Sequence, residues 1–296
     1  MIKSLKKESV ILTKSNIKLT DRMLRIIRNT ENEVKSSKNE VIRPEHLLLA
    51  CFLENTGVLG EISLKCDIDI KSIRTSIDRM NVGLNQYSTS EFFNVPVSKE
   101  LLTVMDLAVE YMKKYKQVYL NEGHILKALI KTNVAETFLT EDQKQIILTL
   151  GTNSRDMITH LGNYTFPETS SQIIVRKINK NDFNNLYNFV EYNFSSEWLQ
   201  TIKDAFSLID PAIFIALDQN GEIVGFACFD VYKNKKCYFG PMGVSISKRI
   251  NGIGYSLLHH CLKEMKEIGY EYAIIGGAGP IEFYEKTCKA VVIPYT

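Results

Sequence analysis

An internal duplication in the first half of the chain constrains its fold more than any other sequence feature. The segment 46–50, HLLLA, recurs 78 residues later as segment 124–128, HILKA, and apolar positions upstream of both copies also coincide. Each copy opens with a hydroxyl residue, Thr20 or Ser98, placed to cap a helix whose apolar residues follow a helical spacing. Because repeated sequence folds into repeated structural units, we expect a two-fold pseudo-symmetric bundle of helices.

The duplicated region resembles the N-terminal domain of the Clp-type protein unfoldases, which contains two such motifs. Its best match is the segment 45–48, EHLL, at the start of a predicted second helix, and the resemblance covers residues 16–151. It implies recruitment of protein substrates or adaptors and, as in some members, binding of phosphorylated arginine through Thr20 and Glu45. The second copy has Gly123 in place of the glutamate. A capping and dipole role is the alternative for Glu45.

The second half of the chain has a different hydrophobic period. Residues 152–171 are polar and include Gly162 and Pro167, which indicates an exposed linker. Further on, alternating apolar residues and turn residues predict strands over 173–175, 212–217, 222–229, 236–246 and 272–275, with helices over 181–190, 255–268 and 281–287. This order favours an α/β fold, a mixed β-sheet flanked by helices. The predicted parts are a tail (1–15), a helical repeat domain (16–151), the linker (152–171) and the α/β domain (172–296).

A glycine-containing turn, residues 247–254, joins a predicted strand to a predicted helix. Gly252 and Gly254 remove the side chains that would keep a ligand away from the backbone, and a helix N-terminus attracts anions. The turn therefore suits a diphosphate. A glycine-rich turn selected only for packing is the alternative.

The turn and its surrounding strands resemble the GNAT acetyltransferase family, whose signature Arg/Gln-x-x-Gly-x-Gly/Ala is matched by Arg249, Gly252 and Gly254. The resemblance covers residues 172–296 and implies acetyl-coenzyme A as acetyl donor. It also implies a pantetheine arm along residues 242–246, where a backbone N–H polarises the thioester carbonyl. The residues implied in cofactor binding are Met242, Val244, Arg249, Ile250, Asn251, Gly252, Ile253, Gly254 and Tyr255.

The same resemblance implies that Tyr284 protonates the departing thiolate of coenzyme A, with core packing as the alternative. The base that accepts the amine proton stays open among Glu282, Glu285, Asp230 and a water relay. The chain ends one strand short of the usual family ending, which predicts an open sheet edge.

Composition narrows the function classes. The net charge of +2 provides no protein-wide basic field for nucleic acid or an anionic membrane, and no apolar run approaches the roughly 18 residues of a membrane span. The six cysteines lack the spacing of zinc sites, so we expect free thiols and no metal. The sequence has no recognisable secretory signal, which favours a cytoplasmic protein. It also contains no G-x-x-x-x-G-K-[ST] loop for ATP, so we do not expect unfoldase activity.

The leading hypothesis is an N-acetyltransferase whose amine acceptor is a small molecule, a peptide or a protein, with a helical domain that recruits a protein partner. A second hypothesis is a non-catalytic adaptor or sensor. In it the helical domain binds a degron or phosphoarginine, and the GNAT-like domain retains only cofactor binding. In a third hypothesis the helical domain binds nothing and packs on its neighbour.

Overall fold

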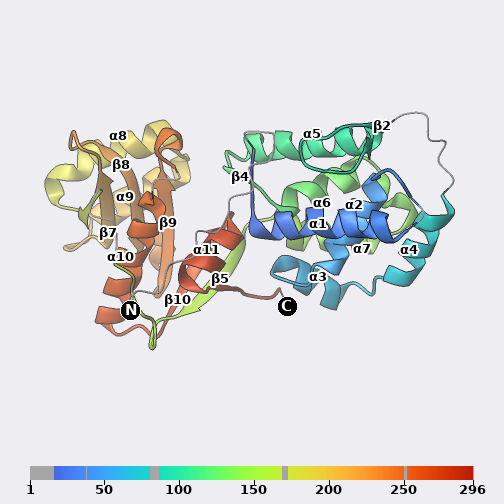
Figure 1. Ribbon diagram of the computed structural model, residues 1–296. Coiled ribbons are helices and arrows are strands. Elements are labelled where there is room, and N and C mark those ends of the chain that lie inside the picture. Colours follow the sequence, from blue (N-terminus) through green and yellow to red (C-terminus); the bar gives the residue numbers. More distant parts are fainter. Residues whose placement is uncertain (1–16, 38, 81–86, 169–172, 250–251, 296) are drawn as a thin grey trace, which may run out of the picture. The chain divides into compact units, whose positions relative to one another are not determined.

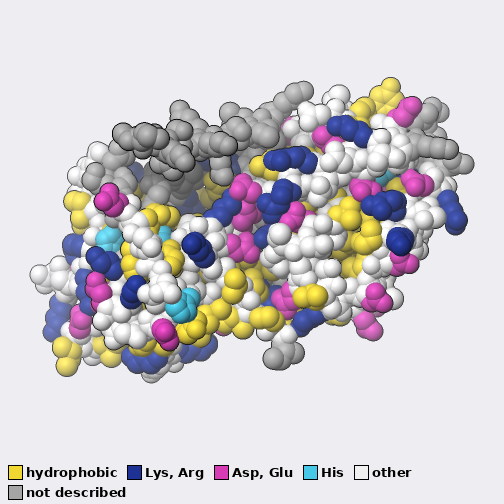
Figure 2. Space-filling view, turned by 60° about the horizontal axis from the view of Figure 1, so that its bottom comes forward, with side chains coloured by type: hydrophobic (Ala, Val, Ile, Leu, Met, Phe, Trp, Pro, Cys, Tyr) yellow, Lys and Arg dark blue, Asp and Glu magenta, His cyan; other side chains and the backbone are white. Residues whose placement is uncertain are grey.

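The computed structural model describes residues 17–37, 39–80, 87–168, 173–249 and 252–295. Contacts within the chain divide it into two compact units, with the boundary between Asn153 and Ser154 (Figure 1). We call these the helical unit and the sheet unit. Among the described helices, none is by itself long and apolar enough to span a membrane. On the face shown in Figure 2, basic and acidic side chains are interspersed.

The helical unit contains two copies of a helix pair, α1 with α2 and α5 with α6, together with shorter helices and strands. The elements are α1 (Asp21–Ser36), α2 (Pro44–Leu53), α3 (Val58–Lys65), α4 (Ile70–Arg79), α5 (Lys99–Lys114), α6 (Glu122–Lys131), α7 (Glu141–Thr152), a 3-10 turn (Val134–Thr137), β1 (Lys18–Leu19), β2 (Tyr87–Ser88), β3 (Val97–Ser98) and β4 (Tyr119–Leu120).

Caps and histidines repeat between the two copies as the duplication predicts. Thr20 and Ser98 each accept a hydrogen bond from the backbone N–H three residues later, at 3.2 and 3.3 Å. His46 and His124 each accept at Nδ1 from the backbone N–H three residues earlier, at 3.0 and 3.1 Å. Burial lowers the pKa of both histidines to about 4, so both are neutral side chains of the core at neutral pH.

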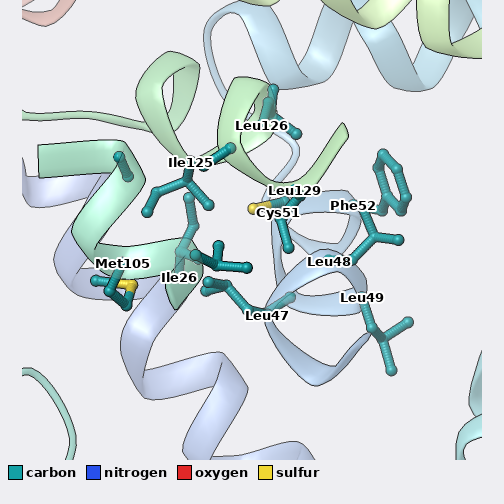
Figure 3. Close-up of a cluster of buried hydrophobic side chains, with 14 of the residues drawn as sticks. Ile26, Leu47, Leu48, Leu49, Cys51, Phe52, Met105, Ile125, Leu126 and Leu129 are labelled. Carbon is teal, nitrogen blue, oxygen red and sulfur yellow. The ribbon is translucent and has the colours of Figure 1, made fainter. Parts of the chain in front are cut away.

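The two copies exchange backbone pairing, because the start of each copy pairs with a segment of the other copy. Strand β1 pairs in parallel with β4, and the Thr20 N–H donates to the Leu120 carbonyl at 3.1 Å. In the same way the Ser98 N–H donates to the Ile42 carbonyl at 2.9 Å. The first helix of each copy therefore begins beside the start of the other copy's second helix. Figure 3 shows part of the core that both copies share, with Ile26, Leu47, Leu48 and Cys51 from the first copy and Met105, Ile125, Leu126 and Leu129 from the second.

The sheet unit is built on a seven-stranded mixed sheet in the order β11-β5-β10-β9-β8-β7-β6. Strands β9 and β10 are parallel, and the other neighbours are antiparallel. Helices α10 and α11 pack on one face of this sheet, and α8 and α9 on the other, which confirms the predicted fold class. The elements are β5 (Arg155–His160), β6 (Ile174–Lys177), α8 (Phe183–Asn193), α9 (Ser196–Phe206), β7 (Ile213–Leu217), β8 (Ile223–Phe229), β9 (Tyr238–Val244), α10 (Ile253–Ile268), β10 (Tyr272–Ala278), α11 (Ile281–Cys288) and β11 (Val291–Val292), with 3-10 turns at Lys180–Asp182, Tyr232–Asn234 and Ile246–Lys248.

The predicted linker over residues 152–171 is wrong for residues 155–160, which form β5 inside the sheet. Arg155 and Thr159 point into the protein although both are polar. The Arg155 side chain donates to the Ile293 carbonyl at 2.9 Å, and the Thr159 hydroxyl donates to the Cys288 carbonyl at 2.5 Å. Because these buried polar groups have hydrogen-bond partners, they are stable in the core. Since they interrupt the alternation of apolar residues, the hydropathy pattern does not indicate a strand here.

The predicted open sheet edge is also wrong, because β5 lies between β10 and β11. Met157 is opposite Ile275 of β10 on one side and Val292 of β11 on the other. Strand β5 is the first strand of the sheet unit in sequence. It pairs with β10 on the side of the sheet that was predicted to be open. Helix α9 was not predicted from the sequence, and it covers the same face as α8.

Candidate functional site

Strands β9 and β10 diverge in the middle of the sheet. They pair only at Tyr238 with Ile274 and at Phe239 with Ile275. Strand β9 then continues to Val244 and stays paired with β8 on its other side, after a cis peptide bond between Gly240 and Pro241. Among the described residues, no strand pairs with the β10-facing edge of residues 240–244. That edge can therefore pair with an extended ligand, as a further strand would.

The predicted diphosphate turn follows directly after this edge. Gly252 has φ +75°, a left-handed conformation that favours glycine, and a Cβ added there would have nothing within 4 Å. Helix α10 begins at Ile253 with no side-chain cap. Its first N–H groups therefore face the turn and suit an anion. Ile250 and Asn251 lie outside the described residues.

Three of the predicted cofactor residues come together around Gly254. A Cβ there would lie 3.9 Å from the side chains of Met242 and Val244, and 3.8 Å from Phe283. The turn and the end of β9 are therefore adjacent in space. Because glycine leaves this contact open, a ligand can approach the first turn of α10 and the strand edge together.

Arg249 ties the turn to the strand. Its Nε donates to the Val244 carbonyl at 3.1 Å, and burial lowers the pKa of the half-buried guanidinium. Ile253 is buried against Gly225, so it contributes only backbone to the turn. Tyr255 lies edge-on to His259, with ring centroids 4.3 Å apart.

Tyr284 of α11 lies against the point where the strands diverge. Its ring contacts Phe239, the last residue of β9 that pairs with β10, and Phe283, with centroid separations of 6.4 and 5.0 Å. Burial raises the pKa of the phenol above its usual value of 10, so the hydroxyl is protonated at neutral pH. Among the described residues, none forms a hydrogen bond with this hydroxyl. It is therefore available to donate to a ligand.

The candidate bases have other contacts. Glu282 forms an ion pair with Lys286 at 3.0 Å. Asp230 accepts from the Tyr270 hydroxyl at 2.6 Å, which raises the pKa of Tyr270 to about 12. Among the described residues, no hydrogen bond joins the Tyr284 hydroxyl to Glu282, Glu285 or Asp230.

The opposite face of the divergence holds residues that the sequence analysis did not select. The Tyr238 side chain lies over Gly276, where an added Cβ would be 1.9 Å from the phenol oxygen. Asp156 of β5 accepts at Oδ1 from the Gly277 N–H at 2.8 Å. The one available sequence signal was the Gly276-Gly277 pair, since glycine inside a strand indicates a bulge or a close approach.

In the helical unit, the two residues predicted to bind phosphoarginine lie at the starts of different helices. Thr20 caps α1 beside the start of α6, whereas Glu45 lies in the first turn of α2, whose start is beside Ser98. No hydrogen bond joins Thr20 to Glu45. The Glu45 Oε2 atom is buried and has no hydrogen-bond partner among the described residues.

Two protein-family models match the chain. Residues 18–142 match the model of the Clp repeat (R) N-terminal domain, and residues 179–289 match the model of the acetyltransferase (GNAT) family. The turn, the end of β9 and Tyr284 all lie inside the second match. Among curated proteins, no match to the sequence was found.

Several solved structures are similar to parts of the chain. The N-terminal domain of ClpD from Arabidopsis thaliana is 22% identical with a TM-score of 0.37, and the match covers 47% of this chain and 97% of that one. A GNAT-type glucosamine N-acetyltransferase region in a fungal multi-domain β-N-acetylglucosaminidase is 18% identical with a TM-score of 0.41, over 48% of this chain and 20% of the fungal one. An N-acetyltransferase from Sphaerobacter thermophilus is 15% identical with a TM-score of 0.40, over 81% of this chain and 90% of that one.

Proposed function

We propose that this chain, which joins a Clp repeat N-terminal domain to a domain of the GNAT acetyltransferase family, is an N-acetyltransferase that uses acetyl-coenzyme A. The observation that supports this most is the meeting of three features at one place. These are the uncapped start of α10 at Gly252, the unpaired edge of β9 and the protonated hydroxyl of Tyr284.

Binding of the donor follows from the backbone. The first N–H groups of α10, together with the cationic Arg249, hold the pyrophosphate. Residues 240–244 of β9 pair with the amide groups of the pantetheine arm and so direct the thioester toward the divergence of β9 and β10. A backbone N–H of the same strand polarises the thioester carbonyl.

Tyr284 supplies the proton for the leaving group. When the acceptor amine attacks the carbonyl carbon, the carbon–sulfur bond breaks and the Tyr284 hydroxyl donates to the sulfur. The amine nitrogen loses a proton to solvent or to a base. The phenol is protonated at neutral pH before each turnover, and the phenolate left after the donation regains a proton from solvent.

In this proposal the helical unit recruits a protein partner. The start of α2 is its best candidate contact, because Glu45 has a buried carboxylate oxygen without a partner. The second candidate function, a non-catalytic adaptor, rests on the same atom, since a guanidinium group is a natural partner for a carboxylate. Titration of phosphoarginine into the wild type and into Glu45→Gln tests this contact, and equal affinities would contradict it.

Calorimetric titration of acetyl-coenzyme A tests the donor site. The variant Gly252→Glu places a side chain and a negative charge at the start of α10, so we expect loss of binding. Gly221→Glu is a matched control, because Gly221 also has a positive φ, +80°, and open space around its Cβ, but lies in the β7–β8 hairpin. Binding by the wild type and the control alone supports the proposal, and absence of binding by the wild type overturns it.

A further inference from the structure

The divergence of β9 and β10 has two faces with different chemistry. Phe239 points to the face of α10 and α11, where it contacts Tyr284. Tyr238, the neighbouring residue, points to the face of α9, because successive side chains of a strand alternate. There its ring stacks on that of Tyr232 at 5.7 Å, and the Tyr232 hydroxyl donates to Glu197 of α9 at 2.8 Å.

Asp156 completes the α9 face of the divergence from the other side of β10. Its neighbour Met157 belongs to the core under α10, so Asp156 points to the same face as Tyr238. Burial, together with the nearby charge of Asp156, raises the pKa of the Tyr238 phenol to about 12, so the phenol is protonated at neutral pH. The phenol crosses Gly276 to approach this carboxylate.

The position of Asp156 is fixed by the strand that carries it. Pairing of β5 with β10 is regular from Tyr272 to Ile275 and then shifts before Ala278. In this irregular part, the Gly277 N–H donates to Asp156 Oδ1 at 2.8 Å, so the carboxylate takes the place of a strand partner. Asp156 is nevertheless exposed. A carboxylate has about four acceptor positions, so it can accept further hydrogen bonds from a ligand.

Ammonium groups already occupy the rings beside this carboxylate. Lys235 Nζ lies 4.6 Å from the Tyr238 ring centroid, and Lys233 Nζ lies 4.8 Å from that of Tyr232. The stacked rings of Tyr232 and Tyr238 thus each contact a primary ammonium group of this chain, which is the cation–π chemistry that an ammonium-bearing ligand would also use.

We propose that Asp156 is the acceptor-binding carboxylate of this domain, which selects amine acceptors that carry a cationic ammonium group. This inference rests on the proposed function and deepens it. The acceptor reaches the thioester from the α9 face, and the sulfur leaves toward Tyr284 on the α11 face. The proton donor, Tyr284, and the acceptor-binding carboxylate, Asp156, therefore act from opposite faces of the sheet.

The test compares Asp156→Asn with the wild type. Asparagine keeps an oxygen that accepts from the Gly277 N–H, so the strand irregularity is preserved while the charge is lost. Glu267→Gln is the control, because Glu267 is an exposed acid on α10 and the substitution removes the same charge. Coenzyme A release is measured with spermidine, which is cationic, and with p-anisidine, which is uncharged at neutral pH.

We expect Asp156→Asn to raise KM for spermidine on the order of 10- to 100-fold and to leave KM for p-anisidine unchanged. An equal KM for spermidine in wild type and variant overturns the inference, and so does an equal change for both amines. Calorimetric titration of spermidine into the protein saturated with coenzyme A separates the two proposals. If the wild type has no turnover but binds spermidine through Asp156, the proposed function fails and the subsite stands.

Discussion

The two units treat the starts of their helices in opposite ways. In the helical unit, α1, α4, α5, α6 and α7 each begin with a side chain that accepts from the first turn, namely Thr20, Asp69, Ser98, Asn121 and Thr140. In the sheet unit, neither α10 nor α11 has such a cap. A capped helix start has satisfied N–H groups and serves stability, whereas an uncapped start retains N–H groups for a ligand.

Helices α2 and α3 are exceptions within the helical unit, because neither begins with a side-chain cap. The N-cap position of α2 is Arg43, whose side chain has no acceptor, and its partner by symmetry, α6, is capped by Asn121. The same start carries Glu45 with its unpartnered carboxylate oxygen. Of the two uncapped starts in the helical unit, that of α2 also carries an unpartnered carboxylate oxygen, so a ligand is expected there.

The largest expected effect concerns the chemistry of the sheet unit. Tyr284→Phe removes the hydroxyl but keeps the ring that packs on Phe239, so we expect kcat to fall about 10²- to 10⁴-fold with donor affinity unchanged. Tyr272→Phe, at an exposed position of β10, is the control. Rates are measured by coenzyme A release, and a Tyr284→Phe enzyme with wild-type kcat would show that Tyr284 only packs.

At low pH, the helical unit should lose more stability than the sheet unit. His46 and His124 have a pKa of about 4 in the folded chain, against 6.5 when unfolded, so the folded state binds fewer protons between these values. Their contribution, roughly 3 kcal/mol each, is fully present above pH 6.5 and is lost as pH falls toward 4. The sheet unit has one such group, His259.

Hydrogen exchange at pH 7 and pH 5, resolved by unit, measures this difference. Between pH 7 and pH 5, we expect amide protection to fall more in the helical unit than in the sheet unit. In the His124→Gln variant, the fall in the helical unit should be smaller than in the wild type. An equal loss of protection in both units would contradict this account.

The sequence predicts the helical unit better than the sheet unit for a physical reason. Its repeat contains the same apolar spacing and the same helix cap twice, so the pattern in each copy supports the helices predicted for the other copy. In the sheet unit, the turn around Gly252 follows from local sequence. Strand β5 does not, because Arg155 and Thr159 are buried through distant carbonyls of Ile293 and Cys288. Asp156 was missed with it, since its place depends on Gly277, 121 residues later.

The smallest expected effect tests the caps themselves. Thr20→Ala and Ser98→Ala each leave an N–H of the first turn without its acceptor, so each should lower the free energy of unfolding by about 1 kcal/mol. Thr103→Ala, on an exposed position of α5, should not, because a hydroxyl inside a helix does not cap it. Urea unfolding measures all three. Since the caps belong to stability and not to the donor site, acetyl-coenzyme A affinity should stay at the wild-type value in each variant, and a loss of affinity in Thr20→Ala would break the division of roles between capped and uncapped helix starts.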